Sequence, residues 1–293
     1  MTKVKEQFVH IDGVRIRYLT AGSGPPVLLL HGLGDSALDW QWVMPRLADR
    51  FRLIAPDLPG YSIGAGDGIV HTPANYSRLL GLFVRDLGLP SVTVVGNSMG
   101  GLVAIRLALE NPGLVPALAL VASAGLGKAI NPLVIPTTLP SGDLAVAASA
   151  TWYGARVRSG LRSLILFANP WRAPREWFEE QHRLIGIPSF RTAILAMSRN
   201  VLDFSGQREV VADELPEMNL PILILWGKFD RMVPVSQGLK VGRLLKQGKI
   251  FTFPDCGHVP HIENPPRFAE VLGDFLEPRL LPQNHLHPFE VAP

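Results

Sequence analysis

The sequence predicts an α/β fold in which a mostly parallel β-sheet is flanked by helices. Short apolar runs alternate with segments of helical periodicity along most of the 293 residues. These runs have no polar face, which is typical of parallel strands that are buried on both sides. Reactive residue types follow several of the runs, and sheets of this kind collect their chemistry at the carboxyl ends of the strands.

A hairpin is predicted over residues 6–19, because apolar and polar residues alternate on both sides of the turn pair Asp12-Gly13. The continuous apolar run Val27–Leu30 predicts a strand that is buried on both faces. The next expected elements are a helix near 41–48, a strand at 51–55, a turn at 56–60 and a helix at 73–88.

The stretch Val92–Gly101 predicts a strand, one sharp turn and then a helix, with Ser98 at the apex of the turn. The strand is expected at 91–95 and the helix at 99–110. Gly96 and Gly100 leave room where side chains would collide. We expect this strained turn to lift the Ser98 hydroxyl clear of the sheet edge, near the positive end of the helix. A serine in that position can act as a nucleophile.

A second Gly-x-Ser-x-Gly pattern at residues 60–64 contains Ser62. Pro56 and Pro59 precede it, and the glycine-rich residues 65–68 follow it, so no helix is expected after this serine. We interpret Ser62 as a loop residue.

The alternation of strands and helices stops after a strand at 116–122. Residues 128–212 contain six prolines and short helical stretches, and we predict that they form a helical cap inserted over the strand ends of a core made of 1–127 and 213–293. Large aromatic residues of this segment include Trp152, Trp171, Trp177 and Phe190. Most are expected to fill helical packing, and the remainder to line an apolar substrate chamber.

The alternation resumes after the predicted cap. Strands are expected at 221–226 and 249–253, and helices at 236–246 and 265–276. We assign no function to the proline-rich tail, residues 278–293.

Composition excludes several classes of protein. The apolar fraction is 47% and charged residues make up 18%, which excludes a disordered chain. The net charge of +3 is spread along the chain, so no nucleic-acid partner is expected. The single cysteine, Cys256, is expected to be a small buried residue, and no Cys/His spacing suggests a metal. Without an apolar leader or a long apolar run, we expect a cytoplasmic protein with no membrane span. The sequence does not indicate the oligomeric state.

Three residues occur in the chain order nucleophile, acid and base, each just past a predicted strand: Ser98, Asp230 and His258. A serine hydroxyl needs a nearby imidazole to take its proton, and that imidazole needs a carboxylate to fix its tautomer. The oxyanion of a tetrahedral intermediate needs two donors, for which the backbone N–H groups of Leu33 and Met99 are the candidates. The sequence therefore predicts acyl transfer from a small-molecule substrate.

The sequence contains other candidates for these roles. His261 is close to His258, but only His258 follows a glycine at a predicted strand end. His31 is interpreted as structural, its imidazole holding the oxyanion loop by hydrogen bonds. The setting of Asp57 suits stabilisation of a turn. The remaining histidines are expected on the surface: His10, His71, His182, His285 and His287.

Five motifs jointly resemble the α/β-hydrolase superfamily: His31-Gly-Leu-Gly, Asp57-Leu-Pro-Gly, Gly96-Asn-Ser-Met-Gly-Gly, Gly227-Lys-Phe-Asp-Arg and Gly257-His. The resemblance covers about residues 8–277. It implies an eight-stranded sheet whose second strand is antiparallel, a cap between the sixth and seventh strands, and no cofactor. It also supports Ser98, Asp230 and His258 as the triad. A serine at the nucleophile position argues against the haloalkane dehalogenase and epoxide hydrolase branches.

The Ser98 turn is similar to that of the meta-cleavage-product hydrolases, which cut a carbon–carbon bond. Those enzymes usually have Gly-Pro-Gly where this chain has Gly34-Asp35-Ser36, and their asparagine and tryptophan are replaced here by Trp42 and Val259. Arg183 is a candidate for their carboxylate-binding arginine. We therefore expect a carboxylesterase acting on small, fairly apolar esters or lactones, with a C–C hydrolase as the alternative.

An alternative of another class is a ligand receptor or binding protein that keeps this fold with little or no turnover. The complete set of candidate catalytic residues argues against it. Ligand-induced stabilisation with negligible turnover would favour the receptor.

Overall fold

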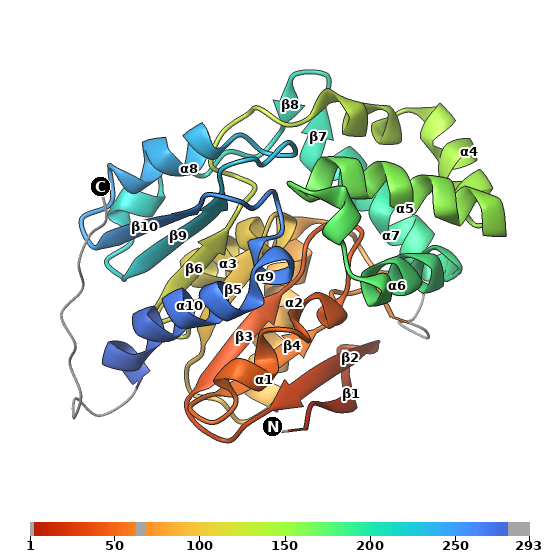
Figure 1. The fold of residues 1–293 in the computed structure, drawn as a ribbon. Helices are drawn as coiled ribbons and strands as arrows, with labels where there is room; N and C mark the ends of the chain where they lie inside the picture. The colour runs from red at the N-terminus through yellow and green to blue at the C-terminus, as the bar shows by residue number, and fades with distance from the viewer. Residues whose placement is uncertain (1–2, 63–67, 281–293) are drawn as a thin grey trace.

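The computed structural model describes residues 3–62 and 68–280. Eight strands form one sheet in the order β1-β2-β4-β3-β5-β6-β9-β10 (Figure 1). Strand β2 runs antiparallel to both of its neighbours, and the other neighbouring strands are parallel. The strands are β1 (Lys5–Ile11), β2 (Val14–Ala21), β3 (Pro26–Leu30), β4 (Arg52–Pro56), β5 (Thr93–Asn97), β6 (Leu118–Val121), β9 (Ile222–Gly227) and β10 (Gly248–Phe253). The predicted mostly parallel sheet is confirmed.

Helices cover both faces of the sheet, because successive side chains of a strand point to opposite faces. In β3, Leu28 and Leu30 belong to one apolar cluster, and Val27 and Leu29 belong to the other. Figure 1 shows α1 and α10 on the near side of the sheet and α2 and α3 on the far side. The helices of these layers are α1 (Met44–Leu47), α2 (Pro73–Asp86), α3 (Met99–Glu110), α8 (Val235–Gly242) and α10 (Pro265–Leu280).

A largely helical segment lies between β6 and β9. It consists of η2 (Pro132–Thr138), α4 (Pro140–Ser149), α5 (Trp152–Leu166), η3 (Pro170–Arg172), α6 (Arg175–Ile185), α7 (Pro188–Val201), β7 (Leu202–Asp203) and β8 (Gly206–Gln207). Helix α5 begins where the Thr151 hydroxyl accepts a hydrogen bond from the Gly154 N–H. Ion pairs and hydrogen bonds join α5 and α6 to the loop after β3.

Several local expectations differ from the structure. The helix expected near 41–48 is only the single turn α1, preceded by the 3-10 turn η1 (Ala37–Trp40). The one-turn helix α9 (Pro260–Glu263) was not predicted. A further 3-10 turn, η4 (Leu215–Glu217), precedes β9. Among the described residues, no helix combines the length and apolarity that crossing a membrane requires.

Two expectations about burial were wrong. His71 is buried rather than on the surface, because its Nδ1 lies 2.8 Å from the Tyr76 hydroxyl under the Pro59 turn. Trp152 and Trp171 do not fill a core, since they are 74% and 89% exposed. The other two aromatics singled out by the sequence, Trp177 and Phe190, are buried as expected. His285 and His287 lie outside the described residues.

Candidate active site

The turn between β5 and α3 holds Ser98 in a left-handed backbone conformation, with φ 54° and ψ −120°. Such a conformation is costly for a residue with a side chain, so the surrounding packing must enforce it. A Cβ added to Gly96 would lie 2.3 Å from the Gly100 carbonyl oxygen, and one added to Gly100 would lie 2.5 Å from the His31 carbonyl oxygen. The glycines therefore let strand, turn and helix approach closely enough to hold Ser98 at the apex.

Asp230 and His258 are in direct contact. The His258 Nδ1–H donates to Asp230 Oδ2 over 2.8 Å, and the two side chains are only 3% and 0% exposed. The other carboxylate oxygen of Asp230 accepts from the N–H groups of Met232 and Val233 at 2.8 and 3.0 Å. These bonds fix the carboxylate and leave Nε2 of His258 as the ring nitrogen available to a substrate or to a nucleophile.

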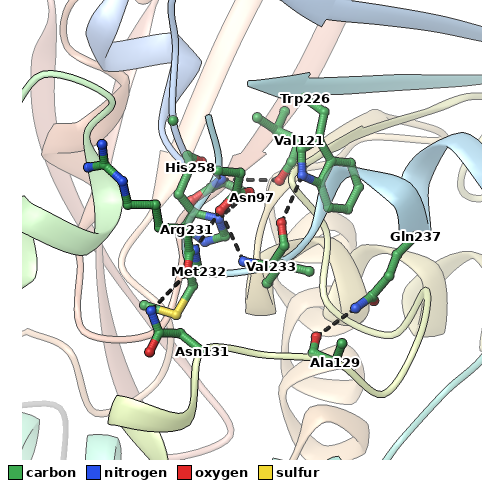
Figure 2. A network of polar contacts seen from close by, with 12 residues as sticks. Asn97, Val121, Ala129, Asn131, Trp226, Arg231, Met232, Val233, Gln237 and His258 are labelled. Carbon is green, nitrogen blue, oxygen red and sulfur yellow. Dashed lines mark hydrogen bonds and ion pairs between the residues drawn. The ribbon is translucent and has the colours of Figure 1, made fainter. Parts of the chain in front are cut away.

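The loop that carries His258 is attached to the serine turn and to α5. The Asn97 side-chain amide, one residue before Ser98, donates to the carbonyl oxygens of Val121 and His258 at 3.1 and 3.2 Å. The His258 N–H donates to the Leu166 carbonyl oxygen at 2.7 Å. Figure 2 shows Asn97 and His258 beside one another, with Val121 on the opposite side of the amide. The candidate base thus lies next to the turn that holds the candidate nucleophile.

The two candidate oxyanion donors come from the two segments that flank Ser98. Met99 is the first residue of α3, and the N–H groups of a first turn have no acceptor within their own helix. A Cβ added to Gly32 would lie 3.3 Å from the Ser98 Cβ, so the loop carrying Leu33 is packed against the serine. Among the described residues, nothing accepts a hydrogen bond from the Leu33 N–H. Both N–H groups therefore belong to segments that adjoin Ser98.

His31 makes hydrogen bonds that hold this loop, in agreement with the structural interpretation. Its Nδ1–H donates to the Gly32 carbonyl oxygen at 2.8 Å, and its Nε2 accepts from the Leu58 N–H at 2.9 Å. Burial lowers the pKa of His31, which favours the neutral ring that these two bonds require. Asp57 accepts from the Ala37 N–H and pairs with Arg17, so it also supports the loops.

Glu263 has a supporting role that the sequence did not reveal. Its Oε1 accepts from the Gly257 N–H at 2.6 Å and its Oε2 from the Ala168 N–H at 2.7 Å. Burial raises the pKa of this carboxyl to about 7. Glu263 thereby joins the residue before His258 to the end of α5. Its position on the unpredicted helix α9 explains why no sequence pattern pointed to it.

His261, the alternative candidate for the base, lies against Trp40 and away from the acid. The two rings stack with centroids 4.4 Å apart, and the imidazole is fully buried. Burial, assisted by the nearby His258, lowers the pKa of His261 to about 3. Within the described part of the chain, neither of its ring nitrogens has a hydrogen-bond partner. This environment suits a neutral packing residue.

A polar cluster ties the Leu33 loop to α5 and α6. The Arg162 guanidinium pairs with Asp35 at 2.8 Å and donates to the Leu33 carbonyl oxygen at 3.4 and 3.5 Å. The Gln181 amide donates to the same Asp35 oxygen at 3.0 Å. These contacts hold the Leu33–Gly34 peptide, which directly follows the peptide whose N–H is a candidate oxyanion donor.

Arg183 forms a second cluster with Glu180 and Ser36. Both Nε and one terminal nitrogen of Arg183 lie 2.6 Å from the Glu180 carboxylate. The Ser36 hydroxyl also donates to Glu180, at 2.6 Å. Because this arginine already has a bidentate carboxylate partner, it is a poor candidate for binding a substrate carboxylate. Across residues 3–62 and 68–280, no cluster of His, Cys, Asp and Glu side chains forms a metal site.

Comparison with known proteins gives matches over most of the chain. The family model for the alpha/beta hydrolase family matches residues 27–271. The chain is 30% identical to a 2-hydroxy-6-oxo-6-(2'-aminophenyl)hexa-2,4-dienoic acid hydrolase of Metapseudomonas resinovorans, covering 94% of this chain and 91% of that protein.

Two solved structures extend the comparison. A serine hydrolase involved in carbazole degradation is 29% identical, with a TM-score of 0.79 and coverage of 94% of this chain and all of that one. A membrane phospholipase A is 27% identical, with a TM-score of 0.77 and coverage of 94% and 86%. All three proteins are named as hydrolases or as a phospholipase.

Proposed function

Because the chain belongs to the alpha/beta hydrolase family, we propose that it is a serine hydrolase that cleaves carboxylic esters or lactones of small, fairly apolar substrates. The observation that carries the proposal is the buried contact of Asp230 with His258 beside the strained Ser98 turn. A hydroxyl, an imidazole and a carboxylate in that order can move a proton away from the attacking oxygen.

In the proposed reaction, His258 Nε2 takes the Ser98 hydroxyl proton while the oxygen attacks the ester carbonyl carbon. The carbonyl oxygen becomes an oxyanion that the Leu33 and Met99 N–H groups stabilise. The intermediate collapses, the alcohol leaves with the proton from His258, and the acyl group remains on Ser98. A water molecule then attacks the acyl group while His258 takes its proton. The acid is released, and the proton returns from His258 to the Ser98 oxygen. Asp230 stays ionised throughout and stabilises the charged imidazole.

We further propose that the helical segment α4–α7 acts as a cap over this reaction. Helix α5 supports the proposal, because its residues contact both the Leu33 loop and the backbone of His258. A cap of this kind excludes water and shapes the substrate chamber.

An ester is favoured over a carbon–carbon bond by the residues around the site. Arg183, the candidate for binding a substrate carboxylate, already has Glu180 as its partner, whereas a neutral ester needs no such arginine. The C–C hydrolase remains the second candidate, since the relative from Metapseudomonas resinovorans is named as a dienoic acid hydrolase.

The test compares p-nitrophenyl butyrate, a lactone panel and a ring-fission dienoate as substrates. We expect the wild type to hydrolyse the esters, and Ser98→Ala to lose at least about 10³-fold in kcat/KM. Ser62→Ala, in the second Gly-x-Ser-x-Gly pattern, is the matched control and should keep full activity. An equally active Ser98→Ala variant would exclude Ser98 as the nucleophile. Faster turnover of the dienoate, followed by the loss of its absorbance, than of any ester would favour the second candidate.

A further inference from the structure

Helix α5 is amphipathic in the opposite sense to an ordinary surface helix. Three of its four buried side chains are small, namely Ala155, Ser159 and Ser163, and the fourth is Leu166 at its end. Its outward side chains are large and apolar: Tyr153, Val157, Leu161 and Leu164 are 71%, 44%, 58% and 49% exposed. The spacing of these four residues puts them on one face, on successive turns. Packing within the protein therefore does not explain this apolar stripe.

The stripe is part of a larger concentration of exposed apolar side chains. Of the fourteen large apolar side chains exposed in the described part of the chain, eight lie within residues 133–171. Trp152, at the start of α5, is 74% exposed, and Leu144 on the neighbouring helix α4 is 75% exposed. Figure 1 shows α4 at the outer edge of the molecule and α5 running from that edge inward toward the sheet. Contiguous apolar surface of this kind marks an interaction site.

The exposed arginines of residues 132–172 are Arg156 and Arg172, whereas Arg158 and Arg162 turn inward to Gln181 and Asp35. The single acidic residue of this segment, Asp143, is paired with Arg199 of α7, and on the neighbouring helix α6 the exposed Glu179 is paired with Arg175 beside the exposed Glu176. The exposed Arg156 guanidinium lies 4.7 Å from the centroid of the Trp152 ring. An apolar stripe with aromatic residues and a basic edge matches a surface that is apolar inside and anionic outside.

We propose that this α5 face, formed by Trp152, Tyr153, Val157, Leu161 and Leu164, docks onto an anionic phospholipid surface. The apolar side chains enter the boundary between headgroups and acyl chains, and Arg156 contacts the lipid phosphates. A second copy of the chain is a poorer occupant, because a symmetric contact would bring the arginines of two copies together.

Docking of this face bears directly on the candidate site, because the inner side of α5 forms part of its surroundings. Arg162 contacts the Leu33 carbonyl, and the Leu166 carbonyl accepts from the His258 N–H. An apolar ester dissolved in the bilayer would meet the protein at this helix. This last step rests on the proposed function, whereas lipid binding by the α5 face does not.

The experiment measures co-sedimentation of the full chain with vesicles of phosphatidylcholine alone and with 3:1 phosphatidylcholine–phosphatidylglycerol. We expect binding to the anionic vesicles, weakened by salt and by Arg156→Gln. Leu161→Gln should lower the partition coefficient about tenfold, because a polar group replaces a leucine that enters the bilayer in the docked state. Leu244→Gln is the matched control, since Leu244 is 53% exposed at the end of α8, and its binding should equal that of the wild type.

Three results would overturn the proposal. The first is that the wild type binds neither kind of vesicle, and the second is that Leu161→Gln and Leu244→Gln bind the anionic vesicles equally well. The third is that the wild type is a dimer in solution and that Leu161→Gln converts it to a monomer. Quenching of Trp152 by brominated lipid, lost in Trp152→Phe, gives a second measure that is independent of sedimentation. Hydrolysis of p-nitrophenyl butyrate in the absence of vesicles separates failure of docking from failure of the proposed function.

Discussion

The Asn97 side-chain amide donates a hydrogen bond to the backbone carbonyl of His258 over 3.2 Å. Residue 97 lies immediately before Ser98, so this bond connects the serine turn to the loop of the candidate base. The same amide donates to Val121 on the neighbouring strand β6. One buried side chain therefore sets the relative position of two loops that are 160 residues apart in sequence, counting from Ser98 to His258.

Asn97→Ala removes this connection, and we expect kcat to fall about tenfold with a smaller change in KM, because His258 loses a backbone anchor. Asn200→Ala is the matched control, since Asn200 also donates to two backbone carbonyls, those of His71 and Ala196. Steady-state kinetics with p-nitrophenyl butyrate makes the comparison. Equal losses in the two variants would count against a positioning role for Asn97.

Asp230→Asn should keep the fold and lower kcat by about 10³- to 10⁴-fold. The neutral amide no longer stabilises the charged imidazole, and it permits the wrong tautomer of His258. Circular dichroism checks the fold, and ester hydrolysis checks the rate. Asp255→Asn, three residues before His258 in sequence, serves as the control. A loss of only a few-fold in Asp230→Asn would mean that another carboxylate orients the base.

Glu263→Gln should change how stability depends on pH. The folded-state pKa of Glu263 is raised to about 7 from an ordinary value of 4.5, so the folded state holds the proton more tightly than the unfolded chain. Stability from this group is fully present below pH 4.5 and is lost as the pH rises towards 7. Urea unfolding at several pH values measures this: as the pH rises, the free energy of unfolding should decline less for Glu263→Gln than for the wild type.

The control for that measurement is Glu277→Gln, a partly exposed residue that pairs with Arg50 on the surface. Its unfolding free energy should follow the wild-type pH dependence. If the unfolding free energy of Glu263→Gln has the wild-type pH dependence as well, Glu263 does not titrate in this range.

His261→Phe should make the protein more resistant to acid. The pKa of His261 is lowered to about 3 from 6.5, so between these values the unfolded chain binds a proton that the folded protein excludes. The wild type therefore loses up to about 1.4 kcal/mol of stability per pH unit as the pH falls through this window. Phenylalanine can keep the stacking on Trp40 and has no proton to gain.

Denaturant unfolding at pH 7 and at pH 4.5 tests this, with His10→Phe on the exposed strand β1 as control. The free energy of unfolding should differ less between pH 7 and pH 4.5 in His261→Phe than in the wild type. In His10→Phe the difference should equal that of the wild type. Equal differences in both variants would show that His261 is protonated in the folded protein.

The order and type of the main elements could be predicted from the sequence, because parallel strands and amphipathic helices have different apolar periods. The helix expected at 99–110 is α3 with the same ends, and the sharp turn before it has the strained backbone that the two glycines suggested. Short elements such as α1 and α9 could not be delimited in this way, because a single turn has no periodicity.

Residue types and their positions after strands determined by themselves that Ser98, Asp230 and His258 were candidates for one reaction. Only the tertiary structure decided which side chains support them, since Asn97, Arg162 and Glu263 act on backbone groups far away in sequence. Tertiary structure also decided that the large apolar side chains of α5 face outward. A helical pattern fixes which residues share a face, but the neighbouring elements fix which face is buried.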